Sequence, residues 1–288
     1  MTTAEVVEAI RVKTPGGGFR HDLRAARVVW QREMIRFSRD RLRIVTSLIQ
    51  PVLFLFVLGT GLSTITTGSV QSVNLRTFMY PGALSMAVLF TAMFSAASIV
   101  WDREFGFLRE MLVAPVSRWA IVLGKCLGGA TTATLQGVII LALAGIVGVP
   151  YSVSLLLTVF GELLLLAFTL TAFGVMTAAR ITQFQAFMAL NQMLLMPLFF
   201  LSGALFPLGN LPAWLQALTR IDPLTYAVDP VRRAVFAHLH APPTVIAKLN
   251  PGVTWGSYRV STGLELVIVA AMGITMLAVA IWQFRSAD

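Results

Sequence analysis

Charge is what this sequence has little of: 12% of its 288 residues are Asp, Glu, Lys or Arg, whereas 57% are hydrophobic. That balance excludes an ordinary soluble domain and predicts a chain embedded in a lipid bilayer. Acidic residues are the scarcer kind, since 13 Asp and Glu face 22 Lys and Arg and leave a net charge of +9. Because the basic residues gather beside apolar runs, we expect anionic lipid headgroups as their partner and no nucleic acid.

Chemical motifs are also scarce. The single cysteine, Cys126, excludes an internal disulfide, and we interpret it as a packing residue. A P-loop is excluded because Gly124-Lys125 is followed by that cysteine, and neither H-E-x-x-H nor G-x-S-x-G occurs. His238 and His240 have no acidic or cysteine residue near them in sequence that would complete a metal site. We therefore expect a chain that is not itself an enzyme, with no catalytic, cofactor-binding or metal-binding residue.

A cleavable signal peptide is not visible, because the first long apolar run begins only after Arg43. Residues 1–19 are polar and rich in glycine, which predicts a mobile cytoplasmic tail. Residues 20–43 form a basic amphipathic pattern that predicts one helix lying in the membrane interface, with its arginines toward lipid phosphates. Its apolar stripe is Leu23, Ala26, Trp30, Met34 and Phe37, and its basic face includes Arg24, Arg27 and Arg36.

Six apolar runs have the length of about 20 residues that a membrane-spanning helix needs. We place them at about 44–65, 80–100, 120–147, 154–179, 186–206 and 263–284, within a transmembrane domain 44–285. An even number of spans puts both termini on one side, and the excess of Lys and Arg predicts that this side is the cytoplasm. The expected fold class is therefore an all-α polytopic membrane protein.

A charged connector, about 101–116, links the second and third spans. As a helix it has an apolar stripe, Trp101, Phe105, Leu108 and Leu112, with its charged residues on the other faces. Two interpretations stay open: a solvated helix that only joins two spans, or an element that docks onto a soluble partner.

The stretch 201–236, between the fifth and sixth spans, is too polar and too rich in proline to cross the bilayer. Pro212 predicts the start of one short helix, Asp222 predicts the cap of a second, and Asp229 with Arg233 forms an i, i+4 pair. These could be re-entrant half-helices or a surface hairpin of interfacial helices. The following loop, 237–261, is longer than a simple connection needs.

Glu162 lies about nine residues into the fourth span, where a charge is costly, so it should face a cavity or another helix. It could belong to a translocation path or proton relay, or make a structural hydrogen bond. Glu265, at the start of the sixth span, is expected to be solvated by headgroups. Gly124 and Gly128 form a G-x-x-x-G pattern that allows close helix contact.

Three segments together resemble a known family. They are REFGFLREMLVAPVSRWAIVLGK, FFLSGALFPLGNLPAWL and DPLTYAVDPVRR, in this order. The chain is similar to type-2 ABC exporter permeases, particularly the daunorubicin-resistance-like multidrug efflux branch. This resemblance implies six transmembrane helices after an interfacial helix, a second permease copy as a homodimer or related heterodimer, and a separately encoded ATPase dimer that holds ATP and Mg.

The resemblance also implies a function. The permease would move hydrophobic drug-like or lipid-linked substrate outward from the cytoplasm or inner leaflet by alternating access, in a bacterial cell membrane. The alternative is an ion-coupled efflux carrier that uses Glu162.

The resemblance further suggests three groups of site residues. The connector would couple to the ATPase through Asp102, Arg103, Glu104, Phe105, Gly106 and Arg109. The candidates for the translocation path are Gln50, Glu162, Asn191 and Gln192, with Thr46 and Ser47 nearby. The external half-helices would form a gate region that includes Phe206, Pro207, Trp214, Tyr226, Asp229 and Arg233.

Overall fold

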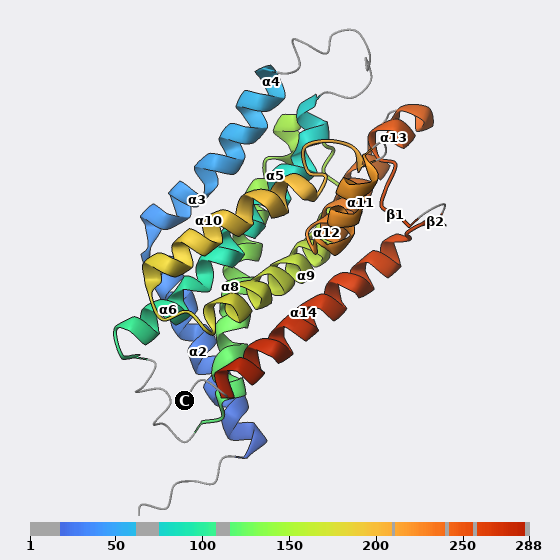
Figure 1. Ribbon diagram of the computed structural model, residues 1–288. Helices are drawn as coiled ribbons and strands as arrows, with labels where there is room; N and C mark the ends of the chain where they lie inside the picture. The colour runs from blue at the N-terminus through green and yellow to red at the C-terminus, as the bar shows by residue number, and fades with distance from the viewer. Residues whose placement is uncertain are drawn as a thin grey trace, which may run out of the picture.

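The computed structural model describes residues 18–61, 75–107, 116–208, 211–239, 242–255 and 258–285. These ranges are almost entirely helical (Figure 1). The N-terminal half contains α2 (Phe19–Arg39), α3 (Arg41–Leu53), the π-helix η1 (Phe54–Leu58), α4 (Gly59–Gly61), α5 (Leu75–Ser95), α6 (Ala97–Glu104) and α8 (Arg118–Leu141). The C-terminal half contains the 3₁₀-helix η3 (Ala144–Val147), α9 (Val153–Ala178), α10 (Phe184–Leu201), α11 (Ala213–Ile221), α12 (Thr225–Ala237), α13 (Pro243–Leu249), the antiparallel strands β1 (Thr254–Trp255) and β2 (Tyr258–Arg259), and α14 (Thr262–Arg285).

Five helical stretches in the described ranges are long and apolar enough to cross a membrane. They are Arg41–Gly61, Leu75–Glu104, Val153–Ala178, Phe184–Leu201 and Thr262–Phe284, and they correspond to five of the six predicted spans. The remaining predicted span is α8, whose 24 residues give a length of about 36 Å at 1.5 Å per residue. It is less apolar because it contains Lys125 together with several glycines and threonines. The predicted all-α polytopic membrane fold is confirmed.

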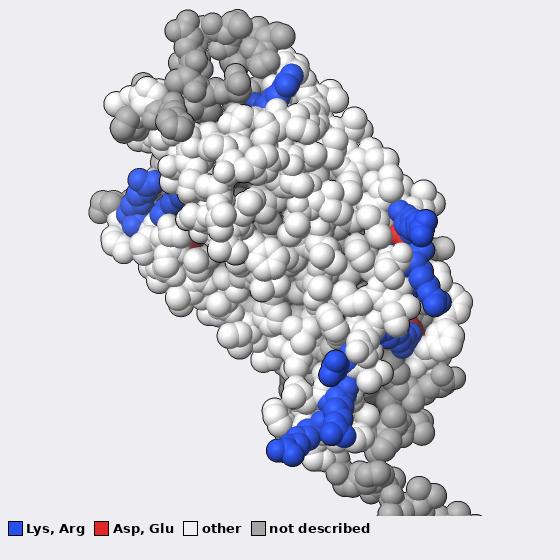
Figure 2. All heavy atoms as spheres, turned by 180° about the vertical axis from the view of Figure 1, so that it is seen from behind, with Lys and Arg blue, Asp and Glu red and all other residues white. Residues whose placement is uncertain are grey.

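The stretch Leu75–Glu104, which comprises α5 and α6, is the most buried of the five. In its most apolar window 83% of the residues are buried, against 17% for Arg41–Gly61 and 22% for both α10 and α14. It packs against α8 and α9, with α3 and α14 on opposite sides of the bundle (Figure 1). Figure 2 shows a broad uncharged area with the basic side chains toward its margins. That pattern fits a lipid-facing surface between two polar ends.

The predicted single helix over 20–43 is wrong, because α2 ends at Arg39 and α3 begins at Arg41. Asp40 leaves the helical region, with φ −92° and ψ 66°, and its carboxylate accepts a hydrogen bond from the backbone N–H of Arg43. This side chain thus caps the first transmembrane helix. Farther along, Pro51 removes a backbone donor, and the helix widens into η1.

Helix α2 does not lie alone on a surface, because it packs along α8. A Cβ atom on Gly124 would lie 2.6 Å from the carbonyl oxygen of Ala26, and one on Gly128 would lie 2.7 Å from Cβ of Glu33. The close contact predicted for the two glycines is thus confirmed, with α2 as the partner. Of the predicted apolar stripe, Ala26 is buried and Trp30, Met34 and Phe37 are half-buried, whereas Leu23 is 52% exposed, so the prediction is wrong at Leu23. Asp22 and Val29 are buried as well. Small side chains and a capping carboxylate fit the glycine surface better than large ones.

Candidate functional site

The first residues of the predicted connector helix, 101–104, are instead the last turn of the second span. Helix α6 continues to Glu104, the chain leaves it at Phe105, and Gly106 has φ +82°, a conformation that favours glycine. The prediction of one helix over 101–116 is therefore wrong at this point, because the left-handed residue ends α6. Arg109, also predicted for coupling, lies outside the described residues.

Asp102 is buried at the centre of a group that we call the ion cluster: Asp102, Lys125, Glu33 and Arg32. The Lys125 Nζ atom lies 2.5 Å from Asp102 Oδ2 and 2.6 Å from Glu33 Oε1, and it also donates to Ser98 Oγ at 3.1 Å. Arg32 Nη2 lies 2.8 Å from Asp102 Oδ1. The cluster joins α2, α6 and α8, with Lys125 and Asp102 buried at its centre and Arg32 partly exposed.

Arg103 and Glu104 bind the end of α9 and the start of α10. The Arg103 guanidinium donates to the carbonyl oxygens of Ala179 at 2.7 Å and Ile181 at 2.8 Å, just beyond the C-terminus of α9. A cation suits this position because the terminal carbonyls have no helical partner. Glu104 accepts the backbone N–H of Phe184, the first residue of α10, at 2.8 Å. Both side chains are thus used within the subunit, and their role toward a partner stays a prediction.

Exposed aromatic side chains surround this helix end. Trp101 is 39% exposed, Phe105 58% and Phe107 49%. The rings of Trp101 and Phe105 are 4.9 Å apart between centroids, and Phe184 meets Trp101 edge-on at 5.0 Å. Large apolar side chains in water are costly, so such a patch is typical of a surface that meets another protein or lipid. Of the coupling residues predicted from sequence, Phe105 is the one that the structure leaves most available.

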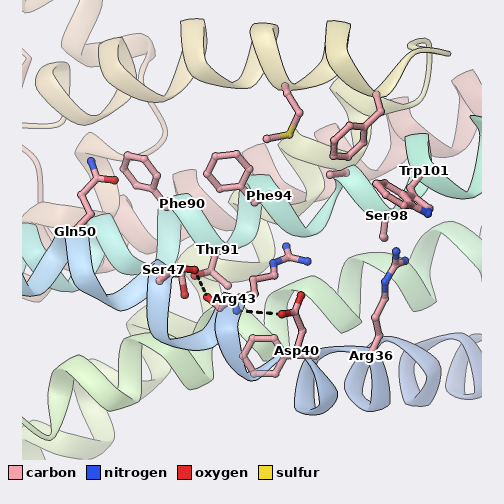
Figure 3. A pocket seen from close by; sticks show the side chains of 15 residues that line it. Arg36, Asp40, Arg43, Ser47, Gln50, Phe90, Thr91, Phe94, Ser98 and Trp101 are labelled. Carbon is pink, nitrogen blue, oxygen red and sulfur yellow. Dashed lines mark hydrogen bonds between the residues drawn. The ribbon is translucent and has the colours of Figure 1, made fainter.

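A cavity of about 510 Å³ lies beside the patch, among α2, α3, α5, α6 and α10 (Figure 3). One side is polar and basic, where α2 meets α3, and the opposite side is aromatic. The lining residues are Arg36, Phe37, Asp40, Arg43, Thr46, Ser47, Gln50, Phe90, Thr91, Phe94, Ala97, Ser98, Trp101, Phe184 and Met188. Its volume is in the range of about 300–1,000 Å³ that is usual for small-molecule sites.

Of the predicted path residues, Thr46, Ser47 and Gln50 line this cavity. Asn191 is buried elsewhere and donates to the carbonyl oxygen of Met93 at 3.2 Å, while Gln192 is exposed. The cavity arises where helices distant in sequence converge, so the pattern of a single span could not reveal it.

Glu162 also lies outside the cavity, on α9, where it is 7% exposed. Within the described part of the chain, its Oε2 atom has no hydrogen-bond partner. The structure therefore confirms that this carboxylate is buried in the span, and leaves its role a prediction.

The predicted short helices at the external end are confirmed as α11 and α12. The Asp222 carboxylate accepts the backbone N–H of Leu224 at 2.9 Å and the hydroxyl of Thr225 at 3.3 Å, in the turn just before α12. The predicted cap at Asp222 is wrong by two residues, because Leu224 is the N-cap residue of α12 and no side chain among the described residues caps this helix. Burial raises the pKa of Asp222 to about 7. Helix α12 is buried against α5, α9 and α14, so its backbone is shielded by protein, as a re-entrant helix requires. The predicted external loop, 237–261, contains α13 and the β1–β2 hairpin.

The predicted pair of Asp229 and Arg233 is present, with a distance of 2.5 Å between Oδ2 and Nη2. Arg233 also approaches Glu265 Oε1 at 3.3 Å and the carbonyl oxygen of Val260 at 3.0 Å. Glu265 is fully buried, so the expected solvation of its carboxylate by headgroups is wrong. The arginine replaces that solvation and ties α12 to α14.

The other predicted gate residues differ in how exposed their side chains are. Tyr226 is buried, donates its hydroxyl to the carbonyl of Arg220 at 2.9 Å and accepts from Trp255 Nε1 at 3.1 Å. Trp214 is 67% exposed, whereas Phe206 and Pro207 are half-buried beyond α10.

Sequence reasoning missed Arg232, which is 3% exposed. It donates to the carbonyl of Gly203 at 2.6 Å and lies 4.8 Å from the centre of the Phe78 ring. This arginine joins α12 to α5 and to the end of α10, a link that no spacing within the sequence predicts.

Comparison with known proteins finds relatives over most of the chain. The family profile described as ABC-2 type transporter matches residues 24–236. The chain is 30% identical over 210 residues to the putative transport permease ycf38 of Cyanophora paradoxa, across 71% of this chain and 72% of that protein. It is 28% identical over 213 residues to nodulation protein J of Rhizobium leguminosarum bv. trifolii, across 73% and 80%. It is 33% identical over 162 residues to the probable multidrug ABC transporter permease YbhR of Escherichia coli K12, across 55% and 43%.

Proposed function

This chain belongs to the ABC-2 type transporter family, whose members are transmembrane subunits of ABC transporters, and from that premise we propose that it is the permease of an exporter. The family implies an ABC ATPase subunit as partner. In the proposed complex, two permease copies and two ATPases move a hydrophobic or lipid-linked molecule from the cytoplasm or inner leaflet outward. ATP and Mg bind to the ATPases, and both permease termini face the cytoplasm of a bacterial cell, as the distribution of Lys and Arg favours.

The observation that carries the proposal is the convergence of helices on the last turn of α6, Trp101–Glu104. Asp102 binds α2 and α8 through Arg32 and Lys125. Arg103 and Glu104 bind the end of α9 and the start of α10. A force applied just after this turn is therefore transmitted to four other helices, and buried ion pairs resist separation because each partner left alone is costly.

Phe105 and Phe107 supply the contact through which such a force enters. They are the exposed aromatic residues directly after α6, and charged side chains of the same turn are used within the subunit. ATP-dependent closure of the ATPases would move this turn and, with it, the helices that enclose the cavity. The cavity next to the turn is the proposed entrance for the transported molecule.

The test is affinity purification of the tagged chain from its own membrane in mild detergent, followed by mass spectrometry and an ATP hydrolysis assay. We expect a P-loop ATPase to co-purify with the wild type and to be lost from Phe105→Asp/Phe107→Asp. The matched control is Tyr258→Asp, because Tyr258 is a similarly exposed aromatic residue, 56%, on the external hairpin. An intact permease that never brings an ATPase would instead favour the ion-coupled carrier.

A further inference from the structure

We infer that the cavity between α3 and α10 binds an amphiphile with an anionic head, a phosphate or carboxylate, at Arg36 and Arg43, and with its apolar body along the aromatic wall. This inference deepens the proposed function and rests on it for the role of the bound molecule as cargo. It names a ligand class that is narrower than the hydrophobic molecules considered so far.

Two guanidinium groups are directed into the cavity (Figure 3). Arg36 comes from the last turn of α2 and Arg43 from the first turn of α3, and both line the cavity. Guanidinium groups present planar sets of N–H donors that match carboxylate and phosphate oxygens. The two arginines therefore suit an acidic group bound in the cavity.

Among the described residues, acidic side chains compensate this pair only in part. Asp40 also lines the cavity, and one of its oxygens accepts the backbone N–H of Arg43 at 3.1 Å. Arg36 Nη1 lies 3.9 Å from Asp102 Oδ1, an atom that already accepts from Arg32 at 2.8 Å. In the described ranges, the Arg43 side chain has no ion-pair or hydrogen-bond partner. The lining thus holds two arginines against one aspartate, and an anionic head would balance the excess charge.

Thr91 provides an independent observation. It lines the same cavity, is 6% exposed, and within the described part of the chain its hydroxyl has no hydrogen-bond partner. A buried hydroxyl without a partner is costly, so it indicates a polar atom that is supplied from outside the chain. Thr91 and Arg43 line the same cavity (Figure 3), so α5 and α3 each supply a hydrogen-bond donor to it.

The apolar wall opposite the arginines indicates that the rest of the ligand is apolar. Phe90 and Phe94 of α5 and Phe184 and Met188 of α10 form an apolar lining without a charged residue. A flexible methionine beside aromatic rings adapts to chains of different shape. The two helices that border the cavity, α3 and α10, are also largely exposed on their other faces, so an alkyl chain can reach it from lipid. A molecule with one acidic end and one apolar end satisfies both walls.

The binding test uses the permease with its co-purified ATPase in phosphatidylcholine nanodiscs. An alkyl phosphate with a diazirine in its chain is photo-crosslinked, and the modified residues are found by mass spectrometry. Dodecyl phosphate and dodecylphosphocholine, which share one chain, then compete. We expect crosslinks at Phe94 or Met188, and competition by dodecyl phosphate at a concentration about tenfold lower, as a charge-assisted hydrogen bond predicts.

Substitutions test whether Arg36 and Arg43 recognise the phosphate head. Arg43→Gln and Arg36→Gln should remove the preference for dodecyl phosphate, and Arg43→Lys should keep part of it. The matched control is Arg24→Gln/Arg27→Gln, because both arginines are exposed on α2 and neither lines the cavity. Retained ATPase binding shows that a variant is folded. Equal competition by both detergents, or crosslinks that avoid the cavity, would overturn the inference.

A second measurement separates cargo from a resident lipid. A fluorescent alkyl phosphate is added to proteoliposomes, and its movement between leaflets is followed with and without ATP. Movement between leaflets that needs both ATP and Arg43 identifies the alkyl phosphate as cargo. Binding without such movement identifies a lipid that stays in the cavity. Either result supports the cavity as a binding site for an anionic amphiphile. If no ATPase co-purifies, the proposed function fails, and the crosslinking of the permease alone still decides the headgroup preference.

Discussion

Lys125 and Asp102 are only 4% and 1% exposed, yet their Nζ and Oδ2 atoms lie 2.5 Å apart. The two residues are on different helices, α8 and α6, and α2 completes their surroundings through Glu33 and Arg32. Burial makes the Lys125 and Asp102 charges depend on each other and on these neighbours, because neither can turn to water. This pair therefore fixes the position of the helix end at which we propose the ATPase acts.

Replacing Lys125 by Met should destabilise the protein by about 3–5 kcal/mol, the usual cost of removing one partner of a buried pair. Asp102 and Glu33 would remain buried with too little positive charge beside them. Denaturant unfolding in detergent micelles measures the loss. The double variant Lys125→Met/Asp102→Asn should recover part of the stability, since one of the two carboxylates left without Lys125 is then neutral. A single variant as stable as the wild type would show that the pair is not needed.

Arg103→Gln should uncouple ATP hydrolysis from transport. The wild-type side chain holds the carbonyls of Ala179 and Ile181, so its loss frees α9 from the end of α6, while Phe105 and Phe107 remain for docking. We expect the ATPase to co-purify and hydrolyse ATP with transport per ATP several-fold lower. Arg24→Gln is the control, because that arginine is exposed on α2. Unchanged transport per ATP would remove Arg103 from the proposed path of force.

Two helical glycines should respond in opposite ways to alanine. At Gly124 the added methyl group would lie 2.6 Å from the Ala26 carbonyl oxygen, so α2 must shift and stability should fall. At Gly161 nothing lies within 4 Å, and alanine should stabilise the helix by about 0.5–1 kcal/mol through lower backbone entropy in the unfolded state. Thermal unfolding of both variants in one detergent compares them. A loss of similar size at both positions would argue against tight packing of α2 on α8.

Asp222 should make stability depend on pH. Burial raises its pKa from 3.8 to about 7, so the folded protein binds this proton more tightly than the unfolded chain. The stabilisation is therefore complete below about pH 4 and is lost as the pH rises through about 7, with a limit of about 4 kcal/mol. Asp222→Asn keeps an oxygen for the Leu224 N–H and removes the titration. The wild type should lose thermal stability between pH 5 and pH 8 by a margin that the variant does not show.

Local features of this fold were predictable, and contacts between distant segments were not. Apolar runs of about 20 residues indicate spans wherever they occur, and Pro212, Asp222 and the four-residue spacing of Asp229 and Arg233 predict α11 and α12 because these effects act within one turn. The ion cluster depends on a contact between Lys125 and Asp102, which lies 23 positions away in the sequence. Nothing in either local pattern indicates that meeting.

The cavity and the burial of Glu265 also depend on contacts between segments that are distant in the sequence. The aromatic side chains of α5 look lipid-facing in sequence, and only the packing of α3 and α10 beside them creates a lined space. Glu265 looks solvated at the start of its span, and only Arg233 from α12 explains its burial.

Glu162→Gln distinguishes the two transport mechanisms. The carboxylate is 7% exposed on α9, lies outside the lined cavity, and within the described ranges has one oxygen without a hydrogen-bond partner. Glutamine keeps the shape and removes the charge, which relieves a burial cost. ATP-driven transport by the reconstituted complex should therefore persist, with stability equal or higher. An ion-coupled carrier would instead lose transport entirely, because its coupling group would no longer bind and release a proton. Measuring uptake with ATP, and separately with an imposed pH gradient, assigns the driving force to one mechanism.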